Sequence, residues 1–203
     1  MVGVDFDSLS GSFDGLRRAT GKPPRNAQAK RVFQVAQIIS PLGPILVAGD
    51  EAAVHLVEFW DRRMLEAQFS GLEKRWDVVF FPGETGPIRQ MREELNAYFS
   101  GDLRTFTTPM LHAGSEHQEQ VWRALMDVPY GETWSYGKLA ARVGRPTAVR
   151  SVARAVGENR MAIMLPCHRI IGADGRLTGY AGGLWRKQFL LNHEGCSKFI
   201  HHA

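Results

Sequence analysis

Cysteine is scarce in this chain, which has only Cys167 and Cys196 among its 203 residues. Two cysteines are too few for the disulfide framework of a small secreted domain or for a cysteine-rich zinc site. The sequence also lacks any run of about 18 apolar residues, the length that a membrane-spanning helix requires. These absences favour a reducing compartment, and we expect a cytoplasmic protein that makes no contact with a membrane.

The beginning of the sequence, MVGVDFDSLSGSFDG, is acidic and has no apolar core, which argues against a secretory signal. No internal repeat or low-complexity segment is present. The apolar fraction of 44% is typical of a globular protein, and 203 residues suffice for one large domain or two modest ones.

The pattern of apolar residues divides the chain into residues 1–30, 31–110 and 111–203. The first segment is polar, and basic toward its end, which predicts a short helix and a linker. In the second, β-rich runs separated by turn residues predict a meander, followed by a helix, a further strand and a second helix. Pro87 suits the start of that second helix, whose apolar stripe comprises Ile88, Met91, Leu95, Tyr98 and Phe99. We therefore expect an α/β domain that ends in a connector.

The third segment is more helical. Ser115 and Gln118 have the spacing of a capping box, and the helix that they would start carries Val121, Trp122, Leu125 and Val128. Ser135 would cap the next helix, and Pro146 suits the start of the one after it. Two helices joined by a short glycine-containing turn predict a helix-turn-helix.

Arginine gathers around this helix pair. The chain has a net charge of +4, and residues 142–169 contain only one acidic residue, Glu158, beside six arginines, namely Arg142, Arg145, Arg150, Arg154, Arg160 and Arg169. Val149, Val152, Ala153 and Val156 would share one side of the second helix, and Thr147, Arg150, Ser151 and Arg154 the other. This small, basic side indicates contact with phosphates, although a solvated helix face would have the same composition.

Cys167 stands in the sequence LPCHRI, between a proline and a His-Arg pair. A cysteine there can be an inert core residue, a metal ligand or a nucleophile. Metal binding is disfavoured because no second cysteine or histidine lies at ligand spacing. The apolar run before Cys167 is strand-like, and adjacent side chains of an extended chain point apart, so that a water could join Cys167 and His168. A nearby histidine or cation lowers the pKa of a thiol and favours its reactive thiolate form.

Four stretches of the sequence, GETWSYGKLA, AVRSVARAVGEN, LPCHRIIGADGRLTGYAGG and RKQFLLNHEG, closely resemble the O6-alkylguanine-DNA alkyltransferases, also called methylated-DNA–protein-cysteine methyltransferases. The match covers residues 115–195 in unbroken order. The earlier stretch ISPLGPILVAGDEAAVHLVEF is similar to the family's N-terminal domain. The resemblance implies an RNase H-like α/β domain followed by a mainly helical domain with a winged-helix-like helix-turn-helix.

The resemblance also assigns roles to residues. Cys167 would accept the alkyl group, His168 would draw the thiol proton through a water, and Glu194 would orient His168. Asn159 would brace the turn beside the active site, Tyr136 would lie near the target nucleotide, and Arg150 would enter the base stack from the minor groove when the base is flipped out. Further DNA contacts would come from Thr147, Ser151 and Arg154, and the substrate pocket would be formed by Tyr180, Ala181, Ala162 and Arg169.

Some residues depart from the family's pattern. Ala181 stands where several relatives have serine, so only its backbone N–H could reach O6 of the guanine. Ala162 replaces a proline of some relatives, which predicts a roomier pocket mouth, and His117 replaces a phenylalanine. The structural zinc ligands of vertebrate relatives are not recognisable. The stretch SFDGLRRATGKPP resembles the closing helix of AraC-type regulator domains, which we interpret as a trace of fusion ancestry.

The sequence thus predicts a monomeric DNA-repair protein that needs no cofactor and no metal. Its partner would be double-stranded DNA carrying O6-alkylguanine, and transfer to Cys167 would be irreversible, so that each molecule acts once. Three other classes stay open at this point: a lesion sensor without a reactive cysteine, which the presence of Cys167 disfavours; a transcriptional regulator that uses the helix-turn-helix; and a cysteine hydrolase.

Overall fold

The computed structural model describes residues 31–196 of the chain. The predicted helix, linker and AraC-like pattern of residues 1–30 lie outside the described residues. Within the described part of the chain, no helix combines the length and the apolar character needed to cross a membrane.

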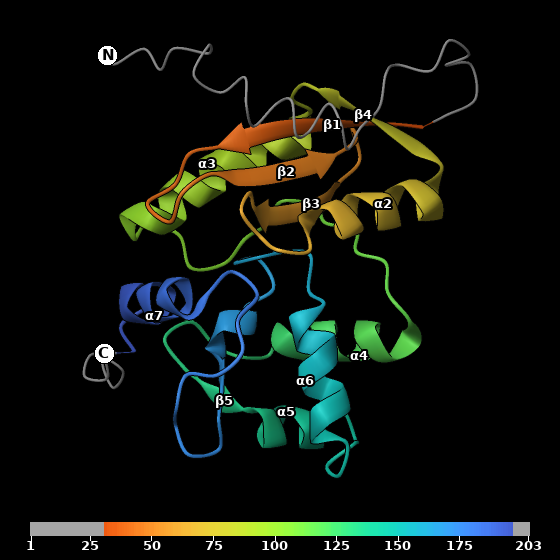
Figure 1. Ribbon diagram of the computed structural model, residues 1–203. Coiled ribbons are helices and arrows are strands. Elements are labelled where there is room, and N and C mark those ends of the chain that lie inside the picture. Colours follow the sequence, from red (N-terminus) through yellow and green to blue (C-terminus); the bar gives the residue numbers. More distant parts are fainter. Residues whose placement is uncertain (1–30, 197–203) are drawn as a thin grey trace.

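The N-terminal half is a four-stranded sheet between two helices (Figure 1). Three antiparallel strands form the predicted meander, and the fourth strand pairs with the first in parallel, giving the order β3-β2-β1-β4. The elements are β1 (Arg31–Ile38), β2 (Ile45–Gly49), β3 (Val54–Phe59), α2 (Leu65–Trp76), β4 (Val78–Pro82) and α3 (Gly86–Ser100). The predicted order of strands and helices is therefore confirmed for this half.

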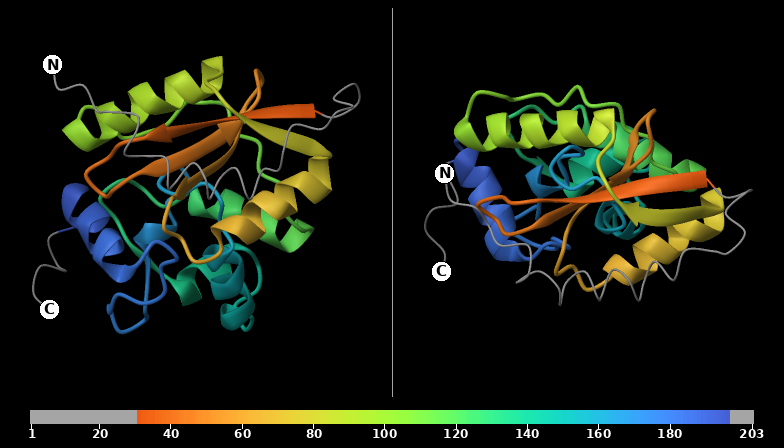
Figure 2. Two further views of the ribbon diagram at one scale, coloured as in Figure 1. Left: turned by 45° about the horizontal axis from the view of Figure 1, so that its top comes forward. Right: turned by 90° about the horizontal axis from the view of Figure 1, so that it is seen from above.

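Helices α2 and α3 cover opposite faces of the sheet (Figure 2). Phe69 and Leu72 of α2 pack against one face, and the buried stripe of α3 packs against the other. Because both faces are covered, all six residues of β3 are buried. Pro87 lies in the first turn of α3, as predicted, and Thr85 caps the helix. Phe99 of the expected stripe is only partly buried.

The C-terminal half lies beneath the sheet in Figure 1 and is mainly helical. Ser115 and Gln118 form the predicted capping box at the first helix. Trp134 and Ser135 pair in parallel with Ile170 and Ile171. The elements are α4 (Glu116–Leu125), β5 (Trp134–Ser135), α5 (Tyr136–Arg142), α6 (Val149–Gly157), the 3-10 helix η2 (Cys167–Arg169), β6 (Ile170–Ile171) and α7 (Leu184–His193).

The helix pair α5–α6 differs from the prediction at its turn. Pro146 does not start α6; it is the second residue of a β-turn in which the Ala148 N–H donates to the Arg145 carbonyl at 2.9 Å. The fixed φ of proline suits this turn position. The buried side of α6 also differs, because it includes Ala155 in place of Ala153. At Ala155 the helix meets α4, whose Trp122 indole N–H donates to the Ala155 carbonyl at 2.8 Å.

The segment before Cys167 is not the strand that the sequence predicts. Met161 forms a single bridge to Val57 of β3, and residues 162–165 then fold into tight turns, in which Ile163 has a positive φ of 71°. The Met164 N–H donates to the Ala162 carbonyl at 2.8 Å, and the Leu165 N–H to the Met161 carbonyl at 2.9 Å. These hydrogen bonds close turns that reverse the direction of the chain, so the segment is not extended. Cys167 and His168 consequently lie in a 3-10 turn, not in an extended segment.

Candidate active site

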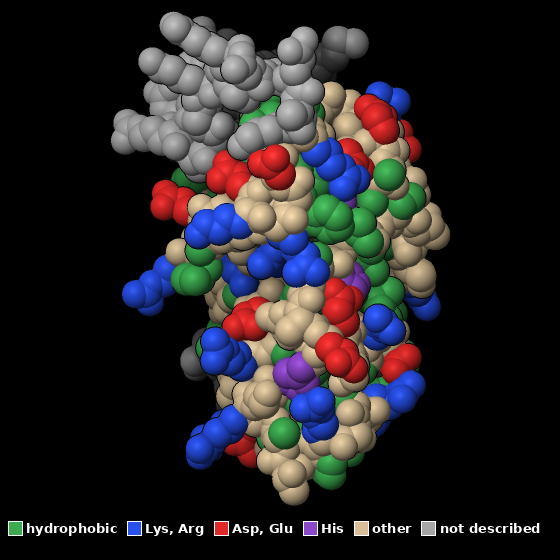
Figure 3. Space-filling model, turned by 90° about the vertical axis from the view of Figure 1, so that its right-hand side faces the viewer, with side chains coloured by type: hydrophobic (Ala, Val, Ile, Leu, Met, Phe, Trp, Pro, Cys, Tyr) green, Lys and Arg blue, Asp and Glu red, His purple; other side chains and the backbone are tan. Residues whose placement is uncertain are grey.

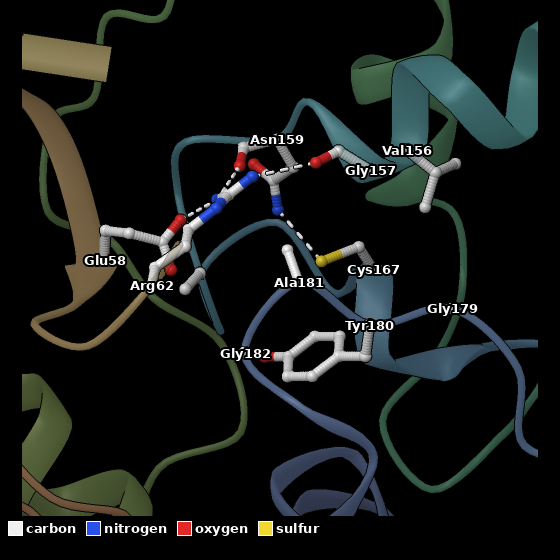
Figure 4. A pocket seen from close by; sticks show the side chains of 11 residues that line it. Glu58, Arg62, Val156, Gly157, Asn159, Cys167, Gly179, Tyr180, Ala181 and Gly182 are labelled. Carbon is white, nitrogen blue, oxygen red and sulfur yellow. Dashed lines mark hydrogen bonds and ion pairs between the residues drawn. The ribbon is translucent and has the colours of Figure 1, made fainter. Parts of the chain in front are cut away.

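A pocket opens directly beside Cys167, between the two halves of the molecule (Figure 4). The pocket is narrow and partly open to the surface. Its walls come from three regions that are distant in the sequence: the end of β3 and the residues after it, the end of α6 with the turn after it, and the loop before α7. The lining residues are Glu58, Arg62, Val156, Gly157, Asn159, Ala162, Cys167, Gly179, Tyr180, Ala181 and Gly182.

The Cys167 thiol is buried, with 8% of the residue exposed, and it has a polar neighbour. The Asn159 side-chain amide donates to the Cys167 Sγ at 3.1 Å. Burial raises the pKa of the thiol, while the Asn159 hydrogen bond and the charges of Arg62 and Lys187 oppose this rise because they favour the thiolate. The second cysteine, Cys196, lies in a small apolar cluster with Ile171 and Leu191 and does not line the pocket.

Asn159 holds the turn that leads to the cysteine. Its amide nitrogen also faces the carbonyls of Met161 and Leu165, at 3.3 and 3.1 Å, and its amide oxygen accepts from the Met161 N–H at 2.8 Å. Only 3% of Asn159 is exposed, so these contacts are shielded from water. One side chain thus contacts both the tight turns of residues 161–165 and the thiol.

His168 and Glu194 form a buried pair behind the cysteine. The His168 Nε2 lies 2.9 Å from a Glu194 carboxylate oxygen, and burial lowers the pKa of His168 despite this partner. Arg169 binds the same carboxylate through its Nε and Nη2, at 2.8 and 3.0 Å. The hydrogen bonds from His168 and Arg169, together with the charge of Arg169, outweigh burial and hold the pKa of Glu194 far below its usual value.

This arrangement fixes the tautomer of the imidazole. An ionised carboxylate only accepts hydrogen bonds, so the His168 Nε2 carries the proton that bonds to Glu194. The His168 Nδ1 is then an acceptor, and it is buried without a hydrogen-bond partner among residues 31–196. His168 can therefore take up a proton at Nδ1 while Glu194 stabilises the resulting charge.

The loop before α7 is held by buried polar contacts. Lys187 is completely buried, and its Nζ donates to the carbonyls of Ile170 and Thr178. The Tyr136 hydroxyl donates to the Gly179 carbonyl at 3.2 Å, which places Tyr136 against this loop and not in the lining of the pocket. A side chain at Gly182 would collide with Phe59. The loop is therefore fixed from β3, α5 and α7.

The predicted pocket residues divide into two groups. Ala162, Tyr180 and Ala181 line the pocket beside Cys167. Arg169 does not: its guanidinium is occupied by Glu194 and by the Val128 carbonyl, at 2.7 Å, and it borders a separate cavity. Four residues near the site were not predicted, namely Glu58, Arg62, Tyr98 and Lys187. No local pattern marks them, because each belongs to an ordinary strand, helix or turn sequence.

The predicted DNA-contacting residues lie on the surface around α6. Arg150, Ser151 and Arg154 are exposed on the helix, and Thr147 is exposed in the preceding turn. The Ser151 hydroxyl lies 2.9 Å from the His117 Nε2, and Arg154 pairs with Glu158 at 3.0 Å. Figure 3 shows the side of the molecule that carries α4 and α6, where lysine and arginine side chains are interspersed with acidic ones.

Among the described residues, no three histidine, cysteine or acidic side chains gather in a group that could hold a metal ion. Two hydrogen-bonded pairs lie at the site: the Cys167 thiol with the Asn159 amide, and the His168 imidazole with the Glu194 carboxylate. This arrangement can generate and stabilise a thiolate, and it can do so at the wall of a pocket that reaches the surface.

Comparison with known proteins identifies both halves of the chain. Residues 116–196 match the family model of the 6-O-methylguanine DNA methyltransferase DNA binding domain, and residues 36–111 match that of the ribonuclease-like domain of the same proteins. The methylated-DNA–protein-cysteine methyltransferase of Methanosarcina acetivorans is 45% identical over 157 residues, which cover 77% of this chain and 94% of the relative. The corresponding protein of Mycobacterium bovis is 42% identical over 77% of this chain and 89% of its own length.

Solved structures are similar as well. A crystal structure of Mycobacterium tuberculosis OGT in complex with DNA matches with a TM-score of 0.69 and 38% identity, over 82% of this chain and 94% of that one. A crystal structure of the O6-methylguanine methyltransferase of the same organism matches with a TM-score of 0.65 and 40% identity, over 82% of this chain and 93% of that one.

Proposed function

Since the chain belongs to the 6-O-methylguanine DNA methyltransferase family, we propose that Cys167 is the residue that receives the alkyl group. The reaction of this family is direct repair: an alkyl group passes from a damaged guanine in DNA to a cysteine of the protein, which is used up in one turnover. The observation that carries the assignment is the position of Cys167, whose thiol accepts a hydrogen bond from Asn159 at the wall of a pocket.

The chemistry follows from the groups around the thiol. The thiolate sulfur attacks the alkyl carbon, a carbon–sulfur bond forms, and the bond between that carbon and O6 of guanine breaks. The thiol proton passes through a water to the His168 Nδ1. The departing guanine anion takes one proton from water to reach its keto form, and the imidazolium releases one proton to solvent, so the protons balance. Glu194 stabilises the imidazolium that forms in between. The thioether has no good leaving group, so the step is irreversible.

The fold suits entry of a flipped base from DNA. The exposed side of α6 would lie along the minor groove, with Arg150 entering the base stack at the place that the damaged base leaves, and Ser151, Arg154 and Thr147 contacting the backbone. The loop of residues 172–183 lies next to the helix pair through Tyr136, and it would serve as the wing of a winged helix. We further propose that the protein acts as a monomer on double-stranded DNA carrying O6-alkylguanine.

The residues that line the pocket would determine which damaged bases and alkyl groups the protein accepts. Tyr180 forms one wall and is itself fixed edge-on against Phe59, with ring centroids 6.4 Å apart. Ala181 presents no hydroxyl, so we expect its backbone N–H to be its donor to the guanine O6. Ala162 lies at the pocket with a small side chain, which favours acceptance of alkyl groups larger than methyl.

Mass spectrometry tests the acceptor. After incubation with duplex DNA containing O6-methylguanine, we expect one methyl group per protein molecule, located on Cys167. The Cys167→Ser variant should stay unmodified, and Cys196→Ser, the matched control, should react like the wild type because Cys196 lies in an apolar cluster. A methyl group on Cys196, or full repair by Cys167→Ser, would show that the assignment is wrong.

A further inference from the structure

One wall of the pocket belongs to the other half of the molecule. Glu58 lies in β3 and Arg62 in the turn that follows, both within the ribonuclease-like half, yet both line the pocket beside Cys167 (Figure 4). Their side chains are buried, with 2% of Glu58 and 6% of Arg62 exposed. A buried ion pair is costly unless each charge is well compensated, so the partners of Arg62 indicate what the pair does.

Arg62 binds the turn that carries Asn159. Its Nη1 forms an ion pair with Glu58 and donates to the Asn159 carbonyl at 2.7 Å, and its Nη2 donates to the Gly157 carbonyl at 2.8 Å. Gly157 is the last residue of α6, where carbonyls lack a partner within the helix and where a cation is favoured by the helix dipole. Arg62 therefore closes the end of α6 and fixes the backbone of the following turn.

The backbone of β3 also forms hydrogen bonds with the turn after α6. The Val57 N–H donates to the Arg160 carbonyl at 2.9 Å, and the Ala162 N–H donates to the Val57 carbonyl at 2.7 Å. Arg62 thus binds the main chain at Gly157 and Asn159, and β3 binds it at Arg160 and Ala162. The Asn159 amide, in turn, donates to the Cys167 Sγ.

We propose that Arg62 is a positioning residue for alkyl transfer: by binding the Gly157 and Asn159 carbonyls while paired with Glu58, it holds the Asn159 amide against the Cys167 thiol. The ribonuclease-like half, which contains no part of the Cys-His-Arg motif, would in this way set the geometry of the reactive cysteine. The inference rests on the proposed function, in which Cys167 is the acceptor, and adds a residue that the motif does not contain.

Arg62 also adds a positive charge near the sulfur, which lowers the pKa of the Cys167 thiol. Loss of this charge should therefore raise the pH at which transfer reaches half of its maximal rate. The other ionisable groups that act on the thiol or on its relay keep their partners in such a variant; they are His168, Arg169, Glu194, Lys187, Tyr136 and Tyr180. Glu58 loses its partner, and its carboxylate beside the pocket would act in the same direction as the loss of Arg62, because a nearby negative charge disfavours the thiolate.

The test compares Arg62→Met, which keeps the length of the side chain without its charge or donors, with Arg62→Lys, which keeps the charge. Arg63→Met is the matched control, since Arg63 is the next residue and is exposed. Single-turnover rates would be measured from pH 6 to 9.5 on O6-methylguanine in duplex DNA and on free O6-benzylguanine, together with DNA affinity and the melting temperature of each protein.

We expect Arg62→Met to slow transfer on both substrates by about 10- to 100-fold, since small displacements of a reacting group cost rates of this order. The pH midpoint should move upward and DNA affinity should stay unchanged. Arg62→Lys should keep the pH midpoint of the wild type but transfer more slowly. Arg63→Met should match the wild type in both the transfer rate and the pH midpoint.

Wild-type rates and midpoint in a folded Arg62→Met, or a loss confined to DNA affinity, would overturn the proposal. If Arg62→Met does not fold, Arg62→Lys decides: a single ammonium cannot reproduce the forked contact of a guanidinium with both carbonyls, so an unchanged rate on both substrates would overturn the proposal. Failure of the wild-type protein to react would instead count against the proposed function itself.

Discussion

At the scale of single residues, Glu194 is the side chain on which the polar contacts behind the active site converge. Its carboxylate accepts hydrogen bonds from His168, from Arg169 and from the Tyr98 hydroxyl, the last at 2.8 Å. Tyr98 belongs to α3, in the other half of the molecule. Glu194 thus orients the imidazole and balances a buried guanidinium, two roles that a substitution would disturb together.

We predict that Glu194→Gln slows alkyl transfer by about 10- to 100-fold, the usual effect of losing a partner that orients a reactive group. Part of the rate should return as the pH rises, because the thiolate of Cys167 then forms without help from His168. Breaking the buried pair with Arg169 should also lower the free energy of unfolding by about 3–5 kcal/mol. Transfer rates from pH 6 to 9.5 and chemical denaturation of both proteins measure the two effects.

The low pKa of Glu194 adds a pH signature to this prediction. The carboxyl is ionised in the folded protein at a pH where the unfolded chain would protonate it, so its stabilising effect is complete above the ordinary glutamate pKa of about 4.3. That effect is lost progressively as the pH falls below this value. Glu194→Gln should therefore lose less stability than the wild type as the pH falls. If the pH profiles of rate and stability of the two proteins superimpose, Glu194 neither orients His168 nor balances Arg169.

At the scale of elements, the nine residues of α6 have three distinct structural roles. One side packs against α4 and α5, the opposite side carries exposed arginines, and its last residue begins the turn that holds Asn159. A change on the exposed side need not disturb the other two, which makes α6 suitable for separating the proposed DNA contacts from the proposed chemistry.

We predict that Arg150→Ala slows repair of O6-methylguanine in duplex DNA more than it slows the reaction with free O6-benzylguanine, because base flipping is needed only in the duplex. DNA binding should weaken, and the slope of affinity against salt should fall by about one unit if a phosphate contact is lost. Arg123→Ala, an exposed arginine on α4, is the comparison for a general loss of charge. Equal slowing on both substrates would remove Arg150 from the flipping step.

At the scale of the whole molecule, the two halves share one core. A single cluster of buried residues runs from β2 and α3 through α4, α5 and α6 to α7. Polar contacts cross the same boundary: Arg186 of α7 pairs with Asp61 at 2.9 Å and donates to the Leu42 carbonyl at 2.9 Å. The active site lies at this boundary, so its geometry depends on how the halves fit together.

A shared core predicts that the halves unfold together. We expect one cooperative transition in denaturant, with midpoints that coincide when unfolding is followed by far-UV circular dichroism and by tryptophan fluorescence. Trp76 lies in the N-terminal half and Trp122 in the C-terminal half, so variants that keep only one of the five tryptophans, either Trp76 or Trp122, would reveal separate transitions. Two resolved midpoints would show that the halves are independent.

The sequence by itself determined most of the local elements, and its resemblance to a known family singled out Cys167 as the proposed nucleophile. Apolar spacing predicted the strands and helices of the N-terminal half and the main helices of the C-terminal half, and Ser115 and Gln118 marked the start of α4. The motif around Cys167 pointed to the proposed acceptor. These features depend on neighbours a few residues apart, whose geometry the regular periods of helices and strands fix in advance.

Only the tertiary structure decided which distant side chains complete the site. Arg62 meets Asn159 across 97 positions, and Tyr98 meets Glu194 across 96. The tight turns before Cys167, with the positive φ of Ile163, likewise form where Met161 meets β3. No local period encodes such contacts, because they exist only once the edge of the sheet packs against the helical half and removes these polar groups from water.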